Sequence, residues 1–213
     1  MKVLIFDIWG TVVETGIERS PTKQIKYFLR EKSDFSDFVL KFQNIFMTRE
    51  YDSLRIAFEE VVREFDLNIP EFVYDKMIGT WNKNAILSKA YDETFEVLED
   101  LSKDYKLVLL GNIDKFSYDQ LQQKFELSKY FDKAYLSFET KKLKNDPKTF
   151  DHIAKDFKVK KEDLVMIGDS IPSDMDSAKE AGVKGILVDR RETREFEPKI
   201  KDLTQLKKEL SDS

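Results

Sequence analysis

The sequence predicts an α/β protein with a doubly wound parallel sheet and a helical bundle inserted after the first strand. Short apolar runs alternate with helical patterns after residue 88, which is typical of parallel strands joined by crossover helices. Only helical periodicity occurs between Pro21 and Leu87. The first strand is therefore expected to be separated from the rest of its sheet by a long helical segment.

The first predicted strand covers residues 3–6 and ends at Asp7. Four consecutive apolar residues are typical of a strand buried on both faces. Ligands bind at the carboxyl ends of strands in doubly wound sheets, so this strand would bring the Asp7 carboxylate to that edge. Gly10 permits a tight turn, and Thr11 adds a hydroxyl and a backbone N–H. Taken alone, Asp7 could equally cap the next segment.

The helical segment begins at Ser20 and Pro21, which suit an N-cap and a first helical position. Its apolar residues recur at helical spacing in four stretches, which predicts four amphipathic helices packed as a bundle. These residues are Ile25, Phe28, Leu29; Phe35, Phe38, Val39, Phe42, Ile45; Leu54, Ala57, Phe58, Val61, Val62, Phe65; Phe72, Met77 and Trp81.

The remainder of the chain predicts four more strands and their connecting helices. The strands are expected over 107–110, 134–136, 164–167 and 185–188, with one helix over about 173–181 that stops at Gly182 and a last helix over about 203–210. We therefore expect an α/β core domain made of residues 1–14 and 89–213. Residues 15–88 would form a separate helical domain.

Composition excludes several classes of function. The chain has no cysteine, which rules out disulfides, thiol catalysis and cysteine-bound zinc, and its one histidine rules out a two-histidine metal site. A net charge of −5 argues against a nucleic-acid partner. No apolar run approaches the roughly 18 residues of a membrane span, and no signal peptide pattern is present. We expect a cytoplasmic protein without a membrane partner, as a monomer or a homodimer.

Polar side chains follow three of the predicted strands. Asp7, Asn112 and Asp169 stand at strand ends, Asn112 after Gly111, and these ends meet at one edge of a parallel sheet. Lys144 precedes a helix, and Asp174 lies five residues after Asp169. Carboxylates without cysteine favour a hard cation such as Mg²⁺, and a nearby lysine suits an anionic centre. The residues alone thus indicate phosphoryl chemistry, with an aspartate as nucleophile or metal ligand.

In this order, these motifs resemble the haloacid dehalogenase superfamily, whose members are mostly phosphatases. The resemblance covers essentially the whole chain, and its most specific part runs from Gly168 and Asp169 through Asp174 to Ala181 and Gly182. It identifies residues 15–88 with the helical cap of that family. It implies a magnesium-dependent hydrolase acting on a small phosphorylated molecule.

The resemblance also implies roles for individual residues. Asp7 would attack phosphorus and form an aspartyl-phosphate, and Lys144 would hold Asp7 and the phosphate oxygens. Magnesium would be bound by Asp7, Asp169 and the backbone carbonyl of Trp9, with Asp174 supporting the metal site. Substrate binding would involve Gly10, Thr11, Gly111 and Asn112.

Two positions depart from the phosphatase pattern. Trp9 stands where these phosphatases have a second aspartate, which protonates the leaving oxygen and later activates water. General acid–base assistance contributes about 10²–10⁴-fold, so alkyl phosphates should be poor substrates unless the cap supplies an acid. Gly111 stands where a serine or threonine hydroxyl usually binds the transferring phosphoryl group.

Two alternatives follow from these departures. Trp9 and Asn112 resemble the pattern of the 2-haloacid dehalogenases, which need no metal and use a cap arginine, for which Arg49 is the candidate. Asp169 argues against this alternative, because dehalogenases generally lack that acid. The second alternative is a catalytically impaired protein that binds a phosphorylated ligand or a partner. The substrate itself is not encoded in any motif.

Overall fold

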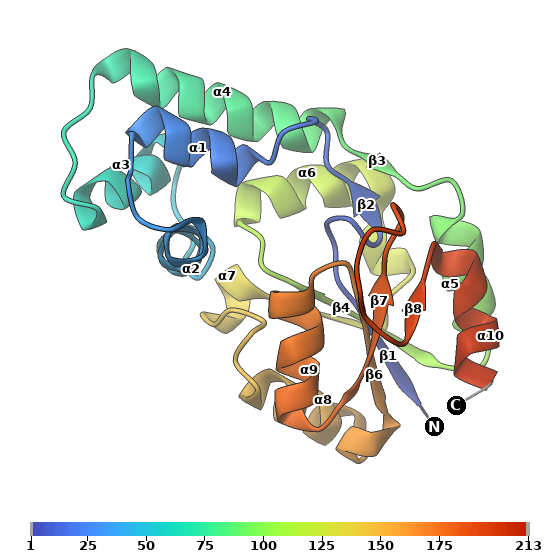
Figure 1. Cartoon of the computed structure of the whole chain (residues 1–213). Helices are drawn as coiled ribbons and strands as arrows, with labels where there is room; N and C mark the ends of the chain where they lie inside the picture. Colours follow the sequence, from blue (N-terminus) through green and yellow to red (C-terminus); the bar gives the residue numbers. More distant parts are fainter. Residues whose placement is uncertain (1, 212–213) are drawn as a thin grey trace.

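A six-stranded parallel sheet forms the centre of the computed structural model, which describes residues 2–211 (Figure 1). Its strand order is β5-β4-β1-β6-β7-β8. The strands are β1 (Val3–Phe6), β4 (Lys106–Gly111), β5 (Lys133–Leu136), β6 (Leu164–Gly168), β7 (Lys184–Val188) and β8 (Lys199–Ile200). Since β1 lies between β4 and β6, the chain winds outwards in both directions from it, and the predicted α/β doubly wound class is confirmed.

Helices cover both faces of this sheet. Alternate residues of β1 separate the two layers: Leu4 and Phe6 belong to one apolar cluster, and Val3 and Ile5 to the other. The first cluster includes α5 (Thr94–Leu101), α6 (Lys115–Phe125) and α10 (Leu206–Ser211); the second includes α8 (Lys148–Phe157) and α9 (Asp176–Ala181). Figure 1 shows α5 and α10 on one side of the strands and α8 and α9 on the other.

Four helices between β1 and β4 pack around an apolar cluster of their own. They are α1 (Pro21–Leu29), α2 (Phe35–Phe46), α3 (Leu54–Glu64) and α4 (Glu71–Leu87). Phe38, Phe42, Phe46, Phe58 and Trp81 are buried here in mutual ring contact. The predicted helical periodicity of this segment is thus correct, and the Ser20 hydroxyl accepts a hydrogen bond from the Lys23 N–H at the start of α1.

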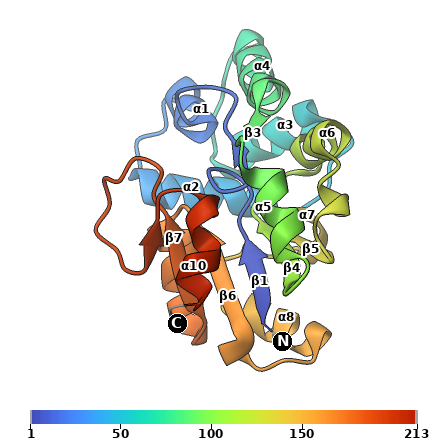
Figure 2. The same cartoon turned by 90° about the vertical axis from the view of Figure 1, so that its right-hand side faces the viewer.

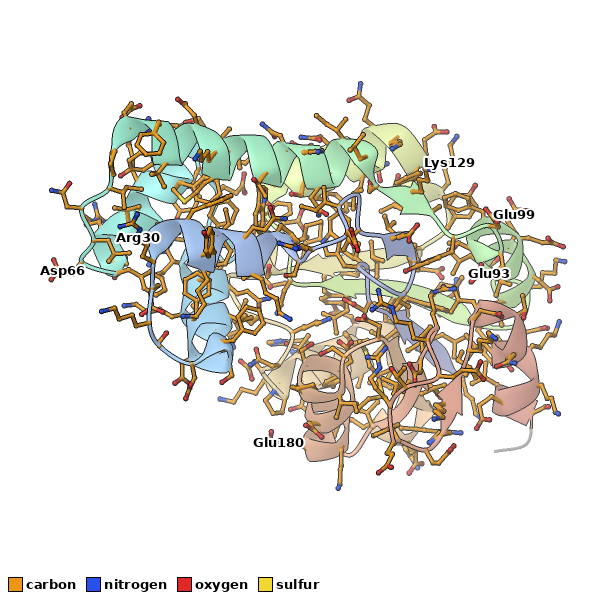
Figure 3. The ribbon with its side chains drawn as sticks, turned by 45° about the horizontal axis from the view of Figure 1, so that its top comes forward. Arg30, Asp66, Glu93, Glu99, Lys129 and Glu180 are labelled. Atoms are coloured by element: carbon orange, nitrogen blue, oxygen red, sulfur yellow. The ribbon has the colours of Figure 1, made fainter. Side chains whose placement is uncertain are left out.

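The helical group lies above one end of the sheet (Figures 1 and 2). Arg30, which follows α1, and Asp66, which follows α3, lie at the outer end of this group, and both have left-handed backbone conformations. Figure 3 shows both residues far from Glu180 of α9. We refer to residues 15–88 as the cap segment. Their division from residues 1–14 and 89–213 as a separate domain stays a prediction.

Short strands were the main feature that the sequence patterns missed. β2 (Val13–Glu14) pairs antiparallel with β3 (Lys89–Ala90), directly before and after the cap segment, and β8 extends the main sheet. Two-residue strands are too short for a recognisable alternation. A short helix, α7 (Ser137–Thr140), follows β5.

The helix predicted over 173–181 begins two residues earlier, at Ile171, and its first turn is π-helical. A π-helical turn covers Ile171–Met175, and α9 follows it. The Met175 N–H donates to the Ser170 carbonyl at 3.2 Å, while the Asp174 carboxylate accepts from the Ser170 N–H at 3.0 Å. This wider turn keeps Asp174 close to the end of β6.

Within residues 2–211, no helix is both long and apolar enough to cross a bilayer.

Candidate active site

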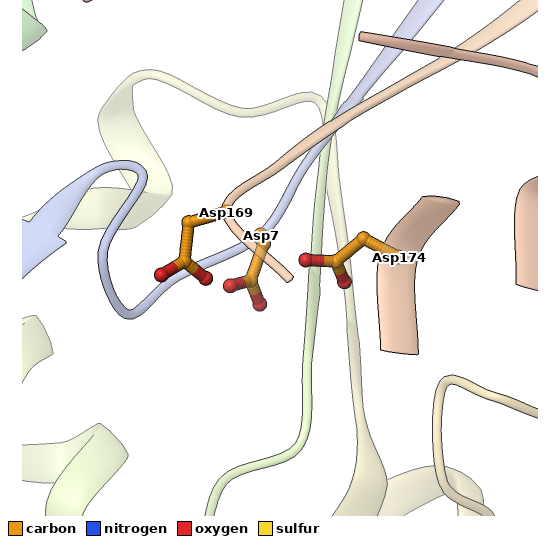
Figure 4. Close-up of side chains that lie close together, drawn as sticks. All are labelled: Asp7, Asp169 and Asp174. Atoms are coloured by element: carbon orange, nitrogen blue, oxygen red, sulfur yellow. The ribbon is translucent and has the colours of Figure 1, made fainter. Parts of the chain in front are cut away.

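Three carboxylates from separate segments meet at the carboxyl end of the sheet. Asp7 follows β1, Asp169 follows β6, and Asp174 belongs to the π-helical turn. Each offers an oxygen within 4.8 Å of the others. Figure 4 shows Asp7 between the other two. The expected convergence of these residues is therefore present in the structure.

Lys144 is the cation of this cluster. Its Nζ lies 2.5 Å from Asp7 Oδ1 and 2.6 Å from Asp174 Oδ1, and its side chain is 6 % exposed. Asp174 Oδ2 accepts the hydrogen bond from the Ser170 N–H, so both Asp174 oxygens are engaged. Asp174 consequently fixes the lysine head against Asp7.

Two glycines make room for the carboxylates. Gly10 has a φ of 82°, and a Cβ built on it would lie 2.3 Å from Asp169 Oδ2. A Cβ on Gly168 would lie 2.3 Å from Asp174 Oδ2. Both distances are far inside van der Waals contact, so any side chain at either position would displace a site carboxylate.

Burial disfavours the ionised forms of the site carboxylates. It raises the pKa of Asp7 to about 7, an effect that Lys144 opposes and that Asp174 and Asp169 reinforce. Burial and the Asp174 charge raise the pKa of Asp169 to about 6. Burial lowers the pKa of Lys144, but the charges of Asp174 and Asp7 outweigh it and raise that pKa above its usual range. The site thus favours binding of a further cation.

A divalent metal ion fits this group of residues. When ionised, three carboxylates face one ammonium, which leaves two unbalanced negative charges in a buried place. Their oxygens are the ligand type that Mg²⁺ and Ca²⁺ prefer, whereas the chain offers neither cysteine nor a second histidine.

Asn112 connects the site to the cap segment. Its Oδ1 accepts a hydrogen bond from the backbone N–H of Lys144 at 2.7 Å, and its Nδ2 donates one to Gln43 Oε1 of α2 at 3.1 Å. Neighbouring Gly111 is crowded by the buried Ile8, whose Cδ1 would lie 2.3 Å from a Cβ built on that glycine. The Ile8 side chain therefore occupies the space that a serine or threonine at position 111 would need.

Trp9 and Thr11 occupy different environments. Trp9 lines two cavities, one of about 170 Å³ between the sheet end and the cap segment and one of about 680 Å³ beside Asp169. Thr11 is fully buried, and its hydroxyl oxygen has no hydrogen-bond partner among the described residues. Of the two, Trp9 is thus the one with access to a ligand cavity.

Two arginines that sequence patterns did not single out hold the backbone of the site. Arg190 donates to the Thr11 carbonyl at 3.0 Å and pairs with Glu93 at 2.8 Å; Figure 3 shows Glu93 near the C-terminal elements. Arg194 donates to the Asp169 carbonyl and contacts the Asp189 carboxylate. They follow β7 in an irregular segment, where no periodic signal exists.

The chain belongs to the haloacid dehalogenase-like hydrolase family, whose family model matches residues 1–182. It is 27 % identical over 193 residues to the glyceraldehyde 3-phosphate phosphatase of Pyrococcus furiosus, covering 87 % of this chain and 80 % of that protein. It is 30 % identical over 202 residues to the N-acylneuraminate-9-phosphatase of Mus musculus, covering 86 % and 80 %. The resemblance inferred from the motifs is thereby confirmed.

Solved structures with the same fold include phosphatases and dehalogenases. A phosphatase of this family from Thermococcus onnurineus superposes with a TM-score of 0.64 at 24 % identity, covering 99 % of this chain and 98 % of that one. The 2-haloacid dehalogenase of Pseudomonas syringae gives a TM-score of 0.66 at 18 % identity, covering 100 % and 99 %. At these identities the likeness concerns the fold, and the chemistry must be argued from the site.

Proposed function

We propose that this hydrolase is a magnesium-dependent phosphatase that acts on a small phosphorylated molecule through an aspartyl-phosphate on Asp7. The observation that carries the proposal is the buried group of Asp7, Lys144, Asp169 and Asp174, with its excess of negative charge. The two curated relatives bear names of phosphatases, for glyceraldehyde 3-phosphate and for N-acylneuraminate 9-phosphate. Both names support a phosphate monoester as substrate.

Asp7 is the proposed nucleophile. One of its carboxylate oxygens attacks phosphorus, the phosphorus–oxygen ester bond breaks, and the alcohol leaves with the bonding electron pair and takes up a proton. Water then attacks the phosphorus of the aspartyl-phosphate, gives up a proton to the solvent, and the bond between phosphorus and the Asp7 oxygen breaks, which releases inorganic phosphate and restores the Asp7 carboxylate. Lys144, 2.5 Å from Asp7, would orient the carboxylate and neutralise the phosphoryl oxygens.

The metal would be held by the Asp7 and Asp169 carboxylates and the Trp9 carbonyl, with Asp174 acting through Lys144. When bound, Mg²⁺ would offset the repulsion between Asp7 and the phosphate. Gly10, whose N–H donates to the Val13 carbonyl, would shape the turn, Thr11 and Gly111 would contribute backbone N–H groups, and Asn112 positions the backbone of Lys144.

Trp9 makes the proposed site dependent on the leaving group. An indole has no proton that it can give to a leaving alkoxide at neutral pH. Phosphate esters of acidic phenols need little protonation, so they are the expected good substrates, whereas simple alkyl esters should turn over slowly.

Hydrolysis of p-nitrophenyl phosphate tests the proposal. We expect turnover that requires Mg²⁺, stops on addition of EDTA and is lost in Asp7→Asn. Asp176→Asn is the matched control, because Asp176 lies on the adjacent helix and is exposed. Absence of metal-dependent turnover in the wild type, or full activity of Asp7→Asn, would contradict the proposal.

A dehalogenase is the second candidate, favoured by Trp9 and Asn112. A dehalogenase would need an arginine from the cap segment at the site, and Arg49 does not meet this need. Arg49 pairs with Glu60 at 3.0 Å, its side chain is 55 % exposed, and it lines neither of the cavities at Trp9. Halide release from 2-haloacids in the presence of EDTA would favour this candidate, and none across a panel of such acids would remove it.

We also propose that residues 15–88 act as a cap that opens and closes over the residues around Asp7. The Asn112–Gln43 and Trp81–Asp114 hydrogen bonds join the two parts in the present arrangement. The connections at 15–19 and 87–91 would be the hinges. Cross-linking the cap segment to the core should then reduce substrate access, and unchanged kinetics would contradict the hinge role.

A further inference from the structure

We propose that Arg190 and Arg194, which follow β7, are positioning residues for the metal site. Each fixes a stretch of main chain that carries a proposed ligand, and together they set the affinity for Mg²⁺. This inference rests on the metal-dependent phosphatase function proposed above and adds two residues to it. The family model matches residues 1–182, so both arginines lie outside the part of the chain that it covers.

Asp169 is the site carboxylate that depends most on its main chain. Lys144 holds the carboxylates of Asp7 and Asp174, and the Ser170 N–H holds Asp174 as well. Within residues 2–211, no side chain donates a hydrogen bond to the Asp169 carboxylate, whereas the Asp169 carbonyl accepts one from the Arg194 guanidinium. The position of the Asp169 oxygens therefore follows from where Arg194 holds the backbone.

Arg194 is itself fixed by the end of β7. Its Nε lies 3.3 Å from Asp189 Oδ1, its backbone N–H donates to Asp189 Oδ2 at 2.7 Å, and its Nη2 donates to the Val188 carbonyl at 3.3 Å. Asp189 is buried, and its N–H donates to the Ile200 carbonyl of β8 at 2.8 Å. The guanidinium thus connects the main sheet rigidly to Asp169.

Arg190 acts on the turn that follows the proposed nucleophile. It donates to the Thr11 carbonyl at 3.0 Å, and its guanidinium lies 3.3 Å from the centre of the Tyr91 ring. Glu93 pairs with it at 2.8 Å. The proposed metal ligand Trp9 lies two residues before Thr11, so a fixed Thr11 carbonyl restricts the direction of the Trp9 carbonyl.

The charge and the contacts of these arginines would act on Mg²⁺ in opposite directions. Each arginine already has its own carboxylate, Asp189 for Arg194 and Glu93 for Arg190. Loss of either cation would leave that acid unpaired and, through charge alone, would tighten the binding of a metal ion. Loss of a contact that orients a ligand weakens metal binding, typically by about 10–100-fold. The sign of the change therefore distinguishes the two effects.

Isothermal titration calorimetry with Mg²⁺ measures the affinity of the whole chain without turnover. Arg190→Met and Arg194→Met remove the donors and keep most of the side-chain length, and each should raise the Kd for Mg²⁺ about tenfold or more. Arg194→Lys keeps the charge but loses the planar fork, so its Kd should lie between those of the wild type and Arg194→Met.

Arg191→Met is the matched control. Arg191 is exposed, lies in the same segment and lines the same cavity beside Asp169 as the other two arginines. It forms no ion pair or hydrogen bond with the part of the chain that the structure describes. We expect its replacement to leave the Kd for Mg²⁺ unchanged.

Kinetics distinguishes positioning from a general loss of structure. Arg194→Met should need about tenfold more Mg²⁺ for half-maximal hydrolysis of p-nitrophenyl phosphate, and saturating Mg²⁺ should restore most of the wild-type kcat. A structural defect alone would lower kcat at every Mg²⁺ concentration, and that result would overturn the positioning role.

The outcomes separate this inference from the proposed function. An unchanged or lower Kd in a methionine variant, or an equal rise in Arg191→Met, would overturn the role of that arginine while metal-dependent turnover continues. If a methionine variant does not fold, the lysine variant at the same position decides, since a wild-type Kd there would overturn the role. A wild type that neither binds Mg²⁺ nor hydrolyses p-nitrophenyl phosphate would overturn the phosphatase function and this inference with it.

Discussion

The Trp81 indole donates a buried hydrogen bond of 2.8 Å to Asp114 Oδ2, which joins the cap segment to the start of α6. Asp114 also caps α6 by accepting from the Ser117 N–H at 3.0 Å. Burial raises the pKa of Asp114 against the opposing effect of these hydrogen bonds. The carboxylate thus depends on both donors, one from each side of the junction.

Trp81→Phe should lower the free energy of unfolding by about 1–3 kcal/mol, because it leaves a buried carboxylate oxygen without its donor. Urea denaturation measures the change. Ser53→Ala, which removes the N-cap of α3 without touching the junction, should cost about 1 kcal/mol. Asp114→Ala removes both the hydrogen bond from Trp81 and the N-cap of α6, so it should lower the free energy of unfolding more than Ser53→Ala does. An equal or smaller loss of stability would contradict the importance of the junction.

Metal binding should stabilise the fold independently of turnover. At 100 times its dissociation constant, Mg²⁺ is expected to add about 2.7 kcal/mol to the free energy of unfolding. Asp169→Asn should lose this increment, and the exposed Asp176→Asn should keep it. Thermal unfolding with and without Mg²⁺ provides the measurement, and a wild type indifferent to the ion would argue against the metal site.

Introducing the missing acid should change the leaving-group dependence. Trp9→Asp is expected to raise kcat/KM for an alkyl phosphate by about 10²-fold relative to that for p-nitrophenyl phosphate, since only the alkoxide needs a proton donor. Trp9→Asn controls for removal of the indole bulk. A similar gain in both variants would assign the effect to space and not to proton transfer.

The Gly111–Ile8 contact predicts a strong coupling between these two positions. Gly111→Ser should cost about 1–3 kcal/mol, because the new Cβ would overlap the buried Ile8 side chain. In the background of Ile8→Ala that cost should largely disappear. A double-mutant cycle in urea measures the coupling, and additive effects would show that the loop relaxes by another route.

Glu31 gives a pH dependence to the cap segment. Burial raises its pKa, but hydrogen bonds from Ser33 and Lys26 outweigh this effect and lower the pKa to about 2. The unfolded state therefore takes up the proton first as the pH falls, and the stabilising contribution, complete above about pH 4.5, is lost as the pH approaches 2. Glu31→Gln should show a flatter decline in stability over this interval, measured by denaturation at several pH values; identical slopes would contradict it.

The sequence predicted the sheet class and the convergence of Asp7, Lys144, Asp169 and Asp174, because continuous apolar strands and the edge rule of parallel sheets determine both. It did not predict contacts that depend on how the cap segment packs on the core. Gln43, Trp81 and Asn84 belong to ordinary helical stripes, and only their tertiary placement brings them to Asn112 and Asp114. The irregular segment with Arg190 and Arg194 likewise has no periodicity to interpret.

The pairing of β2 with β3 brings the entry and exit of the cap segment side by side, with Val13 opposite Ala90. An insertion whose two ends already touch adds little strain to its host, whatever its length. We therefore expect this junction to accept a different helical module, or a short hairpin turn, as a graft. Such chimaeras would separate what the host sheet can do by itself from what the inserted helices contribute.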